Sequence, residues 1–298
     1  MPAFWGLVIA VFAVSWASIF IRWCGDTPAL VISFYRMFWS TLLLLGYQLL
    51  VHPSALQFKT LPRKSKELIV LAGILLALHF ATWIASIQLT KISHSLILES
   101  THPIFALLLS PLFLKEKGSW FAVAAAILAF CGIVIIAGQD MLSLNGKFLG
   151  DTLALAGALF VTLYLLIARH QRDMVELVPY LIAVYAGAAL TLLLLILLFR
   201  YPVLNYPVKI HALMFLLALI PTGIGHSLLN WAARKIPVYK VNFSVLGEPL
   251  IASLLAYFLF AEKPYGFFYL GAVLILIGIV LALLDQSDIN RHEHAEHH

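Results

Sequence analysis

Runs of about 20 apolar residues, separated by short polar, proline or glycine breaks, recur along most of the chain. An α-helix of that length crosses the hydrocarbon core of a bilayer. Strands of a membrane barrel would instead alternate apolar and polar positions over about ten residues. The pattern therefore predicts an all-α integral membrane protein with ten transmembrane helices, at residues 3–22, 28–51, 67–90, 93–114, 118–138, 149–169, 177–200, 210–235, 237–260 and 264–284.

Composition supports this class. The 298 residues are 62% hydrophobic and only 11% charged, whereas a soluble domain is about 45–50% apolar and about 25% charged. The formal charge of +5 does not indicate a nucleic-acid partner, because the basic residues lie in short loops between apolar runs. We expect a multi-pass protein of the cell (cytoplasmic) membrane whose partners are the lipid bilayer and a small-molecule substrate, and which is compatible with a monomer.

The distribution of Lys and Arg predicts the orientation. Twelve of these residues fall in loops on the side of the N-terminus, six fall on the opposite side, and Arg36 lies inside the second expected helix. Cytoplasmic loops carry an excess of Lys and Arg. Both termini are therefore expected in the cytoplasm.

The sequence also repeats itself. Residues 95–117 and 241–263 share a pattern at an offset of 146 residues, in which Pro103 matches Pro249 and His102 matches Glu248. Gly132-Ile133 matches Gly278-Ile279 at the same offset.

The repeat predicts three parts: a five-helix half at 1–140, a second five-helix half at 141–284, and a polar, His-rich cytoplasmic tail at 285–298. Because five is odd, the second half enters the membrane from the opposite side. Such inverted repeats are typical of secondary transporters, whose substrate site lies near the midplane between the halves.

Several motifs resemble the EamA-type exporters of the drug/metabolite transporter superfamily, over about residues 4 to 284. They are Phe34-Tyr35-Arg36, Glu248-Pro249, and the acidic helix ends Leu114-Lys115-Glu116-Lys117 and Phe260-Ala261-Glu262-Lys263. The resemblance implies a ten-helix exporter of amino acids or related metabolites that works by alternating access without ATP. Glu99 and His102 fall outside the generic pattern of that family, where small or hydroxyl residues are expected.

Polar residues at helical spacing form stripes on four expected helices. In lipid such faces must meet one another or water, so the stripes predict a shared aqueous cavity. For Ser and Thr, hydrogen bonding between helices is the favoured interpretation. The stripes are His79, Thr82, Trp83 and Ser86; Ser95, Glu99 and His102; Thr222, His226, Asn230 and Arg234; and Lys240, Ser244 and Glu248.

Glu99 and Glu248 are the candidate proton carriers, because ionisable residues inside a membrane are costly and usually functional. The alternative for both residues is a structural ion pair, for Glu99 with Arg36, and the resemblance implies that a Glu before Pro, as in Glu248-Pro249, can also be a feature of the fold. His102 could act with Glu99 as a proton relay, since histidine titrates near neutrality.

Aromatic residues well inside the expected helices suit an aromatic, aliphatic or cationic organic substrate. Prolines that interrupt helices supply bending points. The candidate substrate-binding and coupling residues are Glu99, His102, His79, Trp83, Glu248, Asn230, His226, Arg36, Trp16 and Tyr164, and the candidate hinges are Pro103, Pro221 and Pro249.

The sequence thus predicts a proton- or gradient-coupled secondary active transporter that exports amino acids or related metabolites. A passive facilitator of the same fold is the alternative. An intramembrane enzyme using a buried Glu-His pair is disfavoured, because no positioned nucleophile or set of metal ligands is evident. The chain contains neither a P-loop nor a dinucleotide-binding glycine motif, so no cofactor and no metal are expected.

Overall fold

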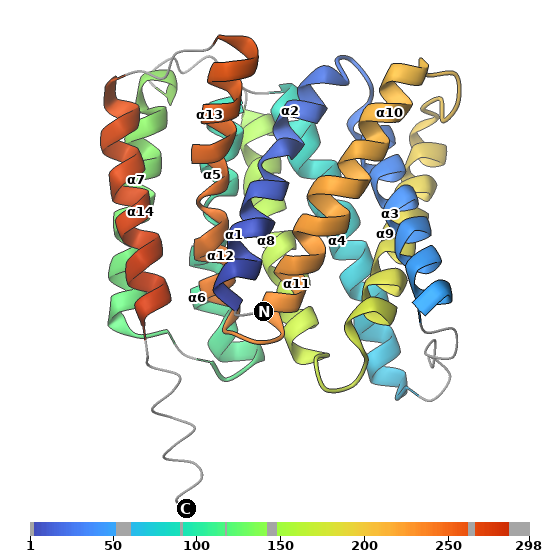
Figure 1. Cartoon of the computed structure of the whole chain (residues 1–298), viewed down its shortest axis with the longest axis horizontal. Coiled ribbons are helices and arrows are strands. Elements are labelled where there is room, and N and C mark those ends of the chain that lie inside the picture. Colours follow the sequence, from blue (N-terminus) through green and yellow to red (C-terminus); the bar gives the residue numbers. More distant parts are fainter. Residues whose placement is uncertain are drawn as a thin grey trace, which may run out of the picture.

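The computed structural model describes residues 3–51, 61–89, 92–116, 118–141, 148–261 and 266–285. Within them the secondary structure is entirely helical (Figure 1). Apart from Asp285, the expected His-rich tail lies outside the described residues, as do Lys117, Glu262 and Lys263. The elements are α1 (Ala3–Val14), α2 (Trp16–Trp23), α3 (Ala29–Val51), α4 (Arg63–Leu89), α5 (Ile92–Glu99), α6 (His102–Phe113), α7 (Trp120–Met141), α8 (Phe148–His170), α9 (Leu177–Phe199), α10 (Val208–Leu217), the π-helix η2 (Ala218–His226), α11 (Ser227–Ala233), α12 (Val238–Val245), α13 (Glu248–Phe260) and α14 (Gly266–Leu284).

Every expected apolar run contains one helix or several consecutive helices. Among the described residues, seven helical segments are long and apolar enough to cross a membrane: Ala3–Trp23, Ala29–Val51, Arg63–Leu89, Phe148–His170, Leu177–Phe199, Val208–Ala233 and Val238–Phe260. The other three expected runs hold shorter apolar helices, at His102–Phe113, Trp120–Ile135 and Tyr269–Leu284. The all-helical, multi-span fold is therefore present, and the total of ten membrane crossings stays a prediction.

The fourth expected helix of each half is broken close to the proline that was expected to interrupt it. Residues 100–101 separate α5 from α6, and residues 246–247 separate α12 from α13, again 146 positions apart. Pro103 and Pro249 stand in the first turn of the second helix of each pair. Proline is tolerated there because that turn's N–H groups have no partner within the helix.

Packing between the halves is reciprocal. The second helices of the halves, α3 and α9, pack on each other, as do the fifth helices, α7 and α14, and the fourth helices through α6 and α12. The first helix of each half packs on the third of the other: α1 contacts η2 and α11, and α8 contacts α4. A two-fold axis relating the halves produces this pattern of neighbours.

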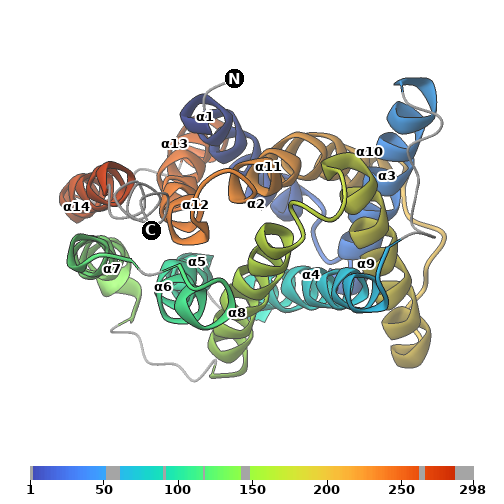
Figure 2. The same ribbon diagram turned by 90° about the horizontal axis from the view of Figure 1, so that it is seen from below.

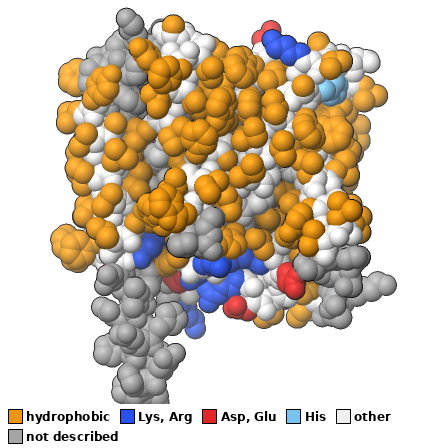
Figure 3. Space-filling view, viewed as in Figure 1, with side chains coloured by type: hydrophobic (Ala, Val, Ile, Leu, Met, Phe, Trp, Pro, Cys, Tyr) orange, Lys and Arg blue, Asp and Glu red, His pale blue; other side chains and the backbone are white. Residues whose placement is uncertain are grey.

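The helices run side by side, and α1 begins toward the same end of the bundle at which α14 ends (Figure 1). Viewed along the helices, the α7–α14 pair stands at one end of the molecule, and α3 and α9 lie at the other (Figure 2). Apolar side chains cover the middle of the face in Figure 3, and Lys and Arg gather mainly at its lower edge. Such an apolar band with a basic edge is the surface expected of a membrane protein.

Two glycines that match in the repeat explain how closely α7 and α14 approach. A Cβ on Gly132 would lie 2.6 Å from the Gly271 carbonyl oxygen, and one on Gly278 would lie 2.9 Å from the Ala125 carbonyl oxygen. Each helix thus presents a glycine to the backbone of the other. Small residues of this kind allow membrane helices to pack tightly.

Replacing Gly278 with Val should lower stability, because the new side chain would collide with backbone and not with a flexible side chain. Overpacking of this kind costs about 1–3 kcal/mol, which thermal unfolding in detergent would detect. Gly46→Val is the matched control, since a Cβ on Gly46 has no neighbour within 4 Å. Equal unfolding temperatures for the two variants would contradict this account of the α7–α14 contact.

Candidate substrate cavity

One cavity lies between the two halves, and most of the candidate residues line it. Its volume is about 30 Å³, which is enough for two or three water molecules. A ligand pocket is far larger, at roughly 300–1,000 Å³. As it stands, the cavity is therefore too small to hold an organic substrate. The lining residues are Val14, Ala17, Arg36, His79, Trp83, Glu99, His102, Val161, Leu165, His226, Leu229, Asn242, Val245 and Glu248.

The broken fourth helices place four repeat-related positions on the cavity wall. Glu99 ends α5 and Val245 ends α12, whereas His102 begins α6 and Glu248 begins α13. Positions 99 and 245 correspond in the repeat, as do 102 and 248. Each half therefore contributes the same two backbone positions but different chemistry. The first turn of a helix favours a negative charge, which suits Glu248.

Arg36 on α3 is the cation of the cavity. Its Nε donates a 2.6 Å hydrogen bond to Thr222 Oγ1 of η2, and its guanidinium lies 4.0 Å from the centre of the Phe80 ring. Its Nη1 is buried without a hydrogen-bond partner. The Thr222 hydroxyl and the face of the Phe80 ring thus contact the guanidinium, and its terminal nitrogen Nη1 has no hydrogen-bond partner.

Within the described part of the chain, no ion pair closer than 4 Å joins Arg36 to Glu99, so the expected direct pair does not form there. Instead, the Thr222 hydroxyl, from the opposite half, accepts a hydrogen bond from the guanidinium Nε of Arg36. Arg36 interacts electrostatically with Glu248 across the cavity. The sequence could not rank these partners, because all three residues come from different helices.

The carboxyl groups of Glu99 and Glu248 line the same cavity. Glu99 and Glu248 are both buried and interact electrostatically with each other. Neither carboxyl group has a hydrogen bond to another described residue. Buried carboxylates normally require hydrogen bonds or a counter-charge, so this pair is open to a proton or a cation.

Three imidazoles surround the carboxyl groups. His79 Nδ1 lies 3.0 Å from the Gly157 carbonyl oxygen, which can only accept, so Nδ1 carries the hydrogen. The His79 ring is parallel to Trp83 and lies 6.2 Å from the His226 ring, centre to centre. His102 lines the cavity beside Asn242, and its Nδ1 is buried without a hydrogen-bond partner. No hydrogen bond joins the described side chains of Glu99 and His102, so the expected direct relay is not formed.

Three other candidates lie outside the cavity lining. Asn230 donates to the Tyr164 hydroxyl and to the His226 carbonyl, and thereby ties α11 to α8. Trp16 is half-buried and stacks on Phe20 within α2. These residues support the site from behind.

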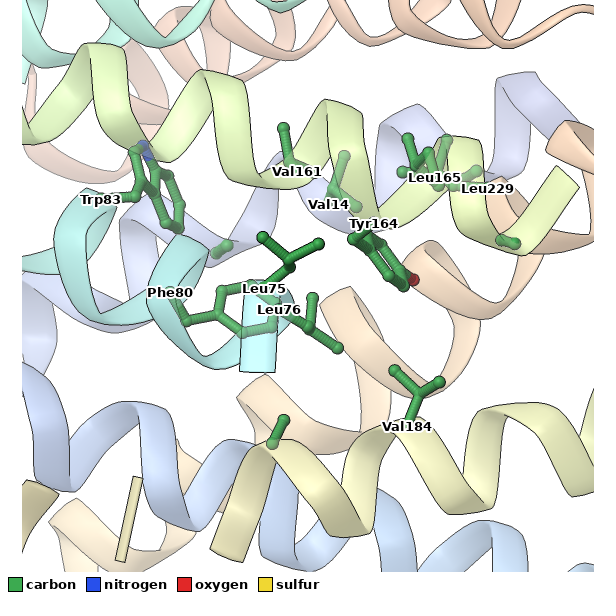
Figure 4. Packing of buried hydrophobic residues seen from close by; sticks show 14 of the residues in the cluster. Val14, Leu75, Leu76, Phe80, Trp83, Val161, Tyr164, Leu165, Val184 and Leu229 are labelled. Atoms are coloured by element: carbon green, nitrogen blue, oxygen red, sulfur yellow. The ribbon is translucent and has the colours of Figure 1, made fainter. Parts of the chain in front are cut away.

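Sequence reasoning missed Phe80 and Asn242. Phe80 follows His79 directly and gives no signal beyond an apolar residue in an apolar run. Asn242 stands three residues before Val245, the repeat partner of Glu99, and that spacing could have placed it on the same helix face. Apolar side chains complete the wall, among them Trp83 of α4, Val161 and Leu165 of α8, Val14 of α1 and Leu229 of α11 (Figure 4).

Pro221 lies inside η2, a nine-residue π-helix. Such segments occur frequently at functional sites. Here the wider turn brings Thr222 to Arg36 and His226 to the cavity. Proline cannot donate a backbone hydrogen bond, which accounts for irregular helix geometry at this point.

At the end of the bundle where α6 and α8 finish, an ion pair joins the two halves. Arg169 at the end of α8 donates from Nε and Nη2 to Glu116 Oε1, at 2.8 and 2.7 Å, and both side chains are largely buried. Arg234 at the end of α11 donates to the carbonyls of Gln171 and Val175 in the α8–α9 loop. These contacts close the end of the bundle where α6 and α8 finish.

A bundle of apolar helices in two matching halves, with ionisable residues lining a cavity between them, defines a multi-pass membrane protein of the transporter class. Comparison with known proteins agrees. The sequence matches the EamA-like transporter family twice, over residues 1–138 and 148–284. The chain therefore belongs to the EamA-like transporter family, and the resemblance drawn from its motifs is confirmed.

Two further similarities support this assignment. An uncharacterized transporter of Synechocystis sp. is 22% identical over 267 residues, which cover 84% of this chain and 75% of the relative. A solved crystal structure with 19% identity covers 95% of this chain and 97% of its own, with a TM-score of 0.80. At that identity the second comparison shows the fold alone.

Thr222→Val should destabilise the protein, because it removes the hydroxyl that accepts from the buried guanidinium of Arg36. Hydrogen bonds to charged groups are worth about 1.5–3 kcal/mol, measurable by thermal unfolding in detergent. Thr222→Ser keeps the hydroxyl and should stay much closer to the wild type. If Val and Ser proved equally stable, Thr222 would not be the anchor of Arg36.

Proposed function

We propose that this protein is a secondary active transporter that exports amino acids or related small metabolites by alternating access. The supporting observation is a cavity to which each half contributes ionisable residues. In this proposal ten helices cross the cytoplasmic membrane as two inverted repeats, and both termini lie in the cytoplasm. The basic edge of the bundle lies at the end where α1 begins and α14 ends, which supports that orientation (Figures 1 and 3).

The chemistry of the lining supports an amino-acid-like substrate. The free Nη1 of Arg36 suits a carboxylate, since Arg recognises carboxylates through charged hydrogen bonds. Glu99 and Glu248 suit an amino group, and Trp83 with its apolar neighbours suits a hydrocarbon part. The cavity must widen to admit such a molecule, which is consistent with a closed state in a transport cycle.

Alternating access requires that one end open while the other is shut. The Glu116–Arg169 ion pair links the end of α6 in the first half to α8 in the second. In this proposal it seals the cytoplasmic end and breaks when the cavity opens there. Pro103, Pro249 and the π-helix around Pro221 adjoin the cavity and act as the bending points.

Coupling to a proton gradient rests on Glu99 and Glu248, two neighbouring carboxyl groups without hydrogen bonds to described residues. A passive facilitator would need no such pair. An enzyme is less well supported, since the cavity lining contains no hydroxyl or thiol nucleophile among the described residues and Glu99 and His102 are not joined by a hydrogen bond.

Glu99→Gln should abolish pH-gradient-driven uptake of radiolabelled amino acids into proteoliposomes, because the amide cannot carry a proton through the cycle. Counterflow, in which labelled and unlabelled substrate exchange without a gradient, should persist. Glu67→Gln is the control, since Glu67 lies on the exposed end of α4 in an ion pair with Arg63. Undiminished gradient-driven uptake by Glu99→Gln would exclude Glu99 from coupling, and flux that never accumulates substrate in the wild type would identify a facilitator.

A further inference from the structure

We propose that the preferred substrate is an amino compound of net charge +1, such as an amino acid with a second amino group, and that it exchanges for one proton at Glu99 and Glu248. This inference rests on the proposed transport function and adds the substrate class. It is carried by the balance of charges in the cavity, together with the placement of the groups that bear them.

The cavity holds an excess of one acidic group. Two carboxyl groups, Glu99 and Glu248, face one guanidinium, Arg36. If all three are ionised, the site has a net charge of −1. An uncompensated charge is costly in apolar surroundings, so the closed site must hold one further positive charge, either a proton or a cation.

The imidazoles are poor places for that positive charge. His79 and His226 both experience the positive charge of Arg36 and lie near each other. His102 lines the same cavity, and its buried Nδ1, like that of His226, has no hydrogen-bond partner that could accept from a protonated ring. The remaining lining residues are apolar. The extra positive charge therefore belongs at the carboxyl pair.

Arg36 can offset only one of the two carboxylates that line the cavity with it, and Glu99 is the carboxyl group that we assign as the excess. Its repeat-related position is Val245, which also lines the cavity and carries no charge. The asymmetry between the halves therefore creates the acidic excess. A symmetric cavity with an apolar residue at both positions would be balanced without any added charge.

The geometry fits a ligand with separated charges. An ammonium group has three donors and no acceptor, and it can bridge the two carboxyl groups that lack partners. A ligand carboxylate can reach the free Nη1 of Arg36. A zwitterion that makes both contacts adds no net charge, so the site still requires its proton. A ligand with one more amino group supplies the missing positive charge itself.

Exchange follows from this balance. When the cationic ligand binds, the O–H bond of the protonated carboxyl group breaks, the proton passes to water on the open side, and the ligand's ammonium group takes its place. No electrons are transferred, and the charge of the site stays at zero. A neutral ligand leaves the proton in place, so its movement is not coupled to a counter-moving proton.

The test compares lysine with norleucine, which has nearly the same shape but lacks the second amino group. The purified full-length protein is titrated in weakly buffered detergent solution containing a pH indicator, and ligand binding is measured by calorimetry. We expect about one proton released per bound lysine and almost none per bound norleucine. Lysine affinity should rise about tenfold per pH unit while the site is protonated, whereas norleucine affinity should stay constant.

Glu99→Gln leaves only Glu248 and Arg36 ionised, so the site is balanced without a proton. Lysine binding to this variant should lose its proton release and its pH dependence and weaken to the level of norleucine. Norleucine binding itself shows that the variant is folded. Glu67→Gln should behave as the wild type, since that carboxyl group is exposed at the end of α4.

Equal proton release with lysine and norleucine, or lysine binding that is independent of pH in the wild type, would overturn the charge-balance proposal. So would proton release that persists in Glu99→Gln. The proposed function fails separately, if neither these compounds nor other amino acids are carried into proteoliposomes by the wild type. Transport of neutral amino acids alone would preserve the transporter and refute the substrate class.

Discussion

The structure depends on how charge is accommodated inside an apolar bundle. Arg36 is fully enclosed, and its guanidinium is held by the Thr222 hydroxyl and the Phe80 ring, which come from opposite halves. Because a buried cation without partners is costly, this contact favours the arrangement in which α3, α4 and η2 converge. The same convergence encloses the cavity that the carboxyl groups Glu99 and Glu248 line.

The two halves share a backbone plan but differ in chemistry. Breaks at corresponding positions of the fourth helices expose four side-chain positions to one cavity. The first half fills them with Glu99 and His102, and the second with Val245 and Glu248. A symmetric frame is suited to opening toward either side, since the two halves can exchange conformations. The lining is asymmetric, because only the first half places a carboxyl group at the position of Glu99 and only the second half places one at the position of Glu248.

Irregular backbone occurs where it touches the cavity. Broken helices and π-helical turns leave backbone groups unpaired, which lipid cannot satisfy, so they are tolerated only against protein or a water-filled space. The breaks before Pro103 and Pro249 and the π-helix around Pro221 all meet this condition. The elements that line the site are therefore also those with the least regular hydrogen bonding, which is where a change of shape costs least.

The sequence by itself determined the class, because hydrophobic length, loop charge and a fixed repeat offset are local properties of the chain. It also pointed to Glu99, His102 and Glu248, since ionisable residues stand out in apolar runs. Only the tertiary structure decided which groups meet. Helical spacing assigns residues to a face but not a face to a neighbour, so it missed Phe80 and Thr222 as the partners of Arg36. Apolar length gave each fourth helix as one span and Pro103 and Pro249 marked its interruption, but only the structure located the two residues at which each helix breaks.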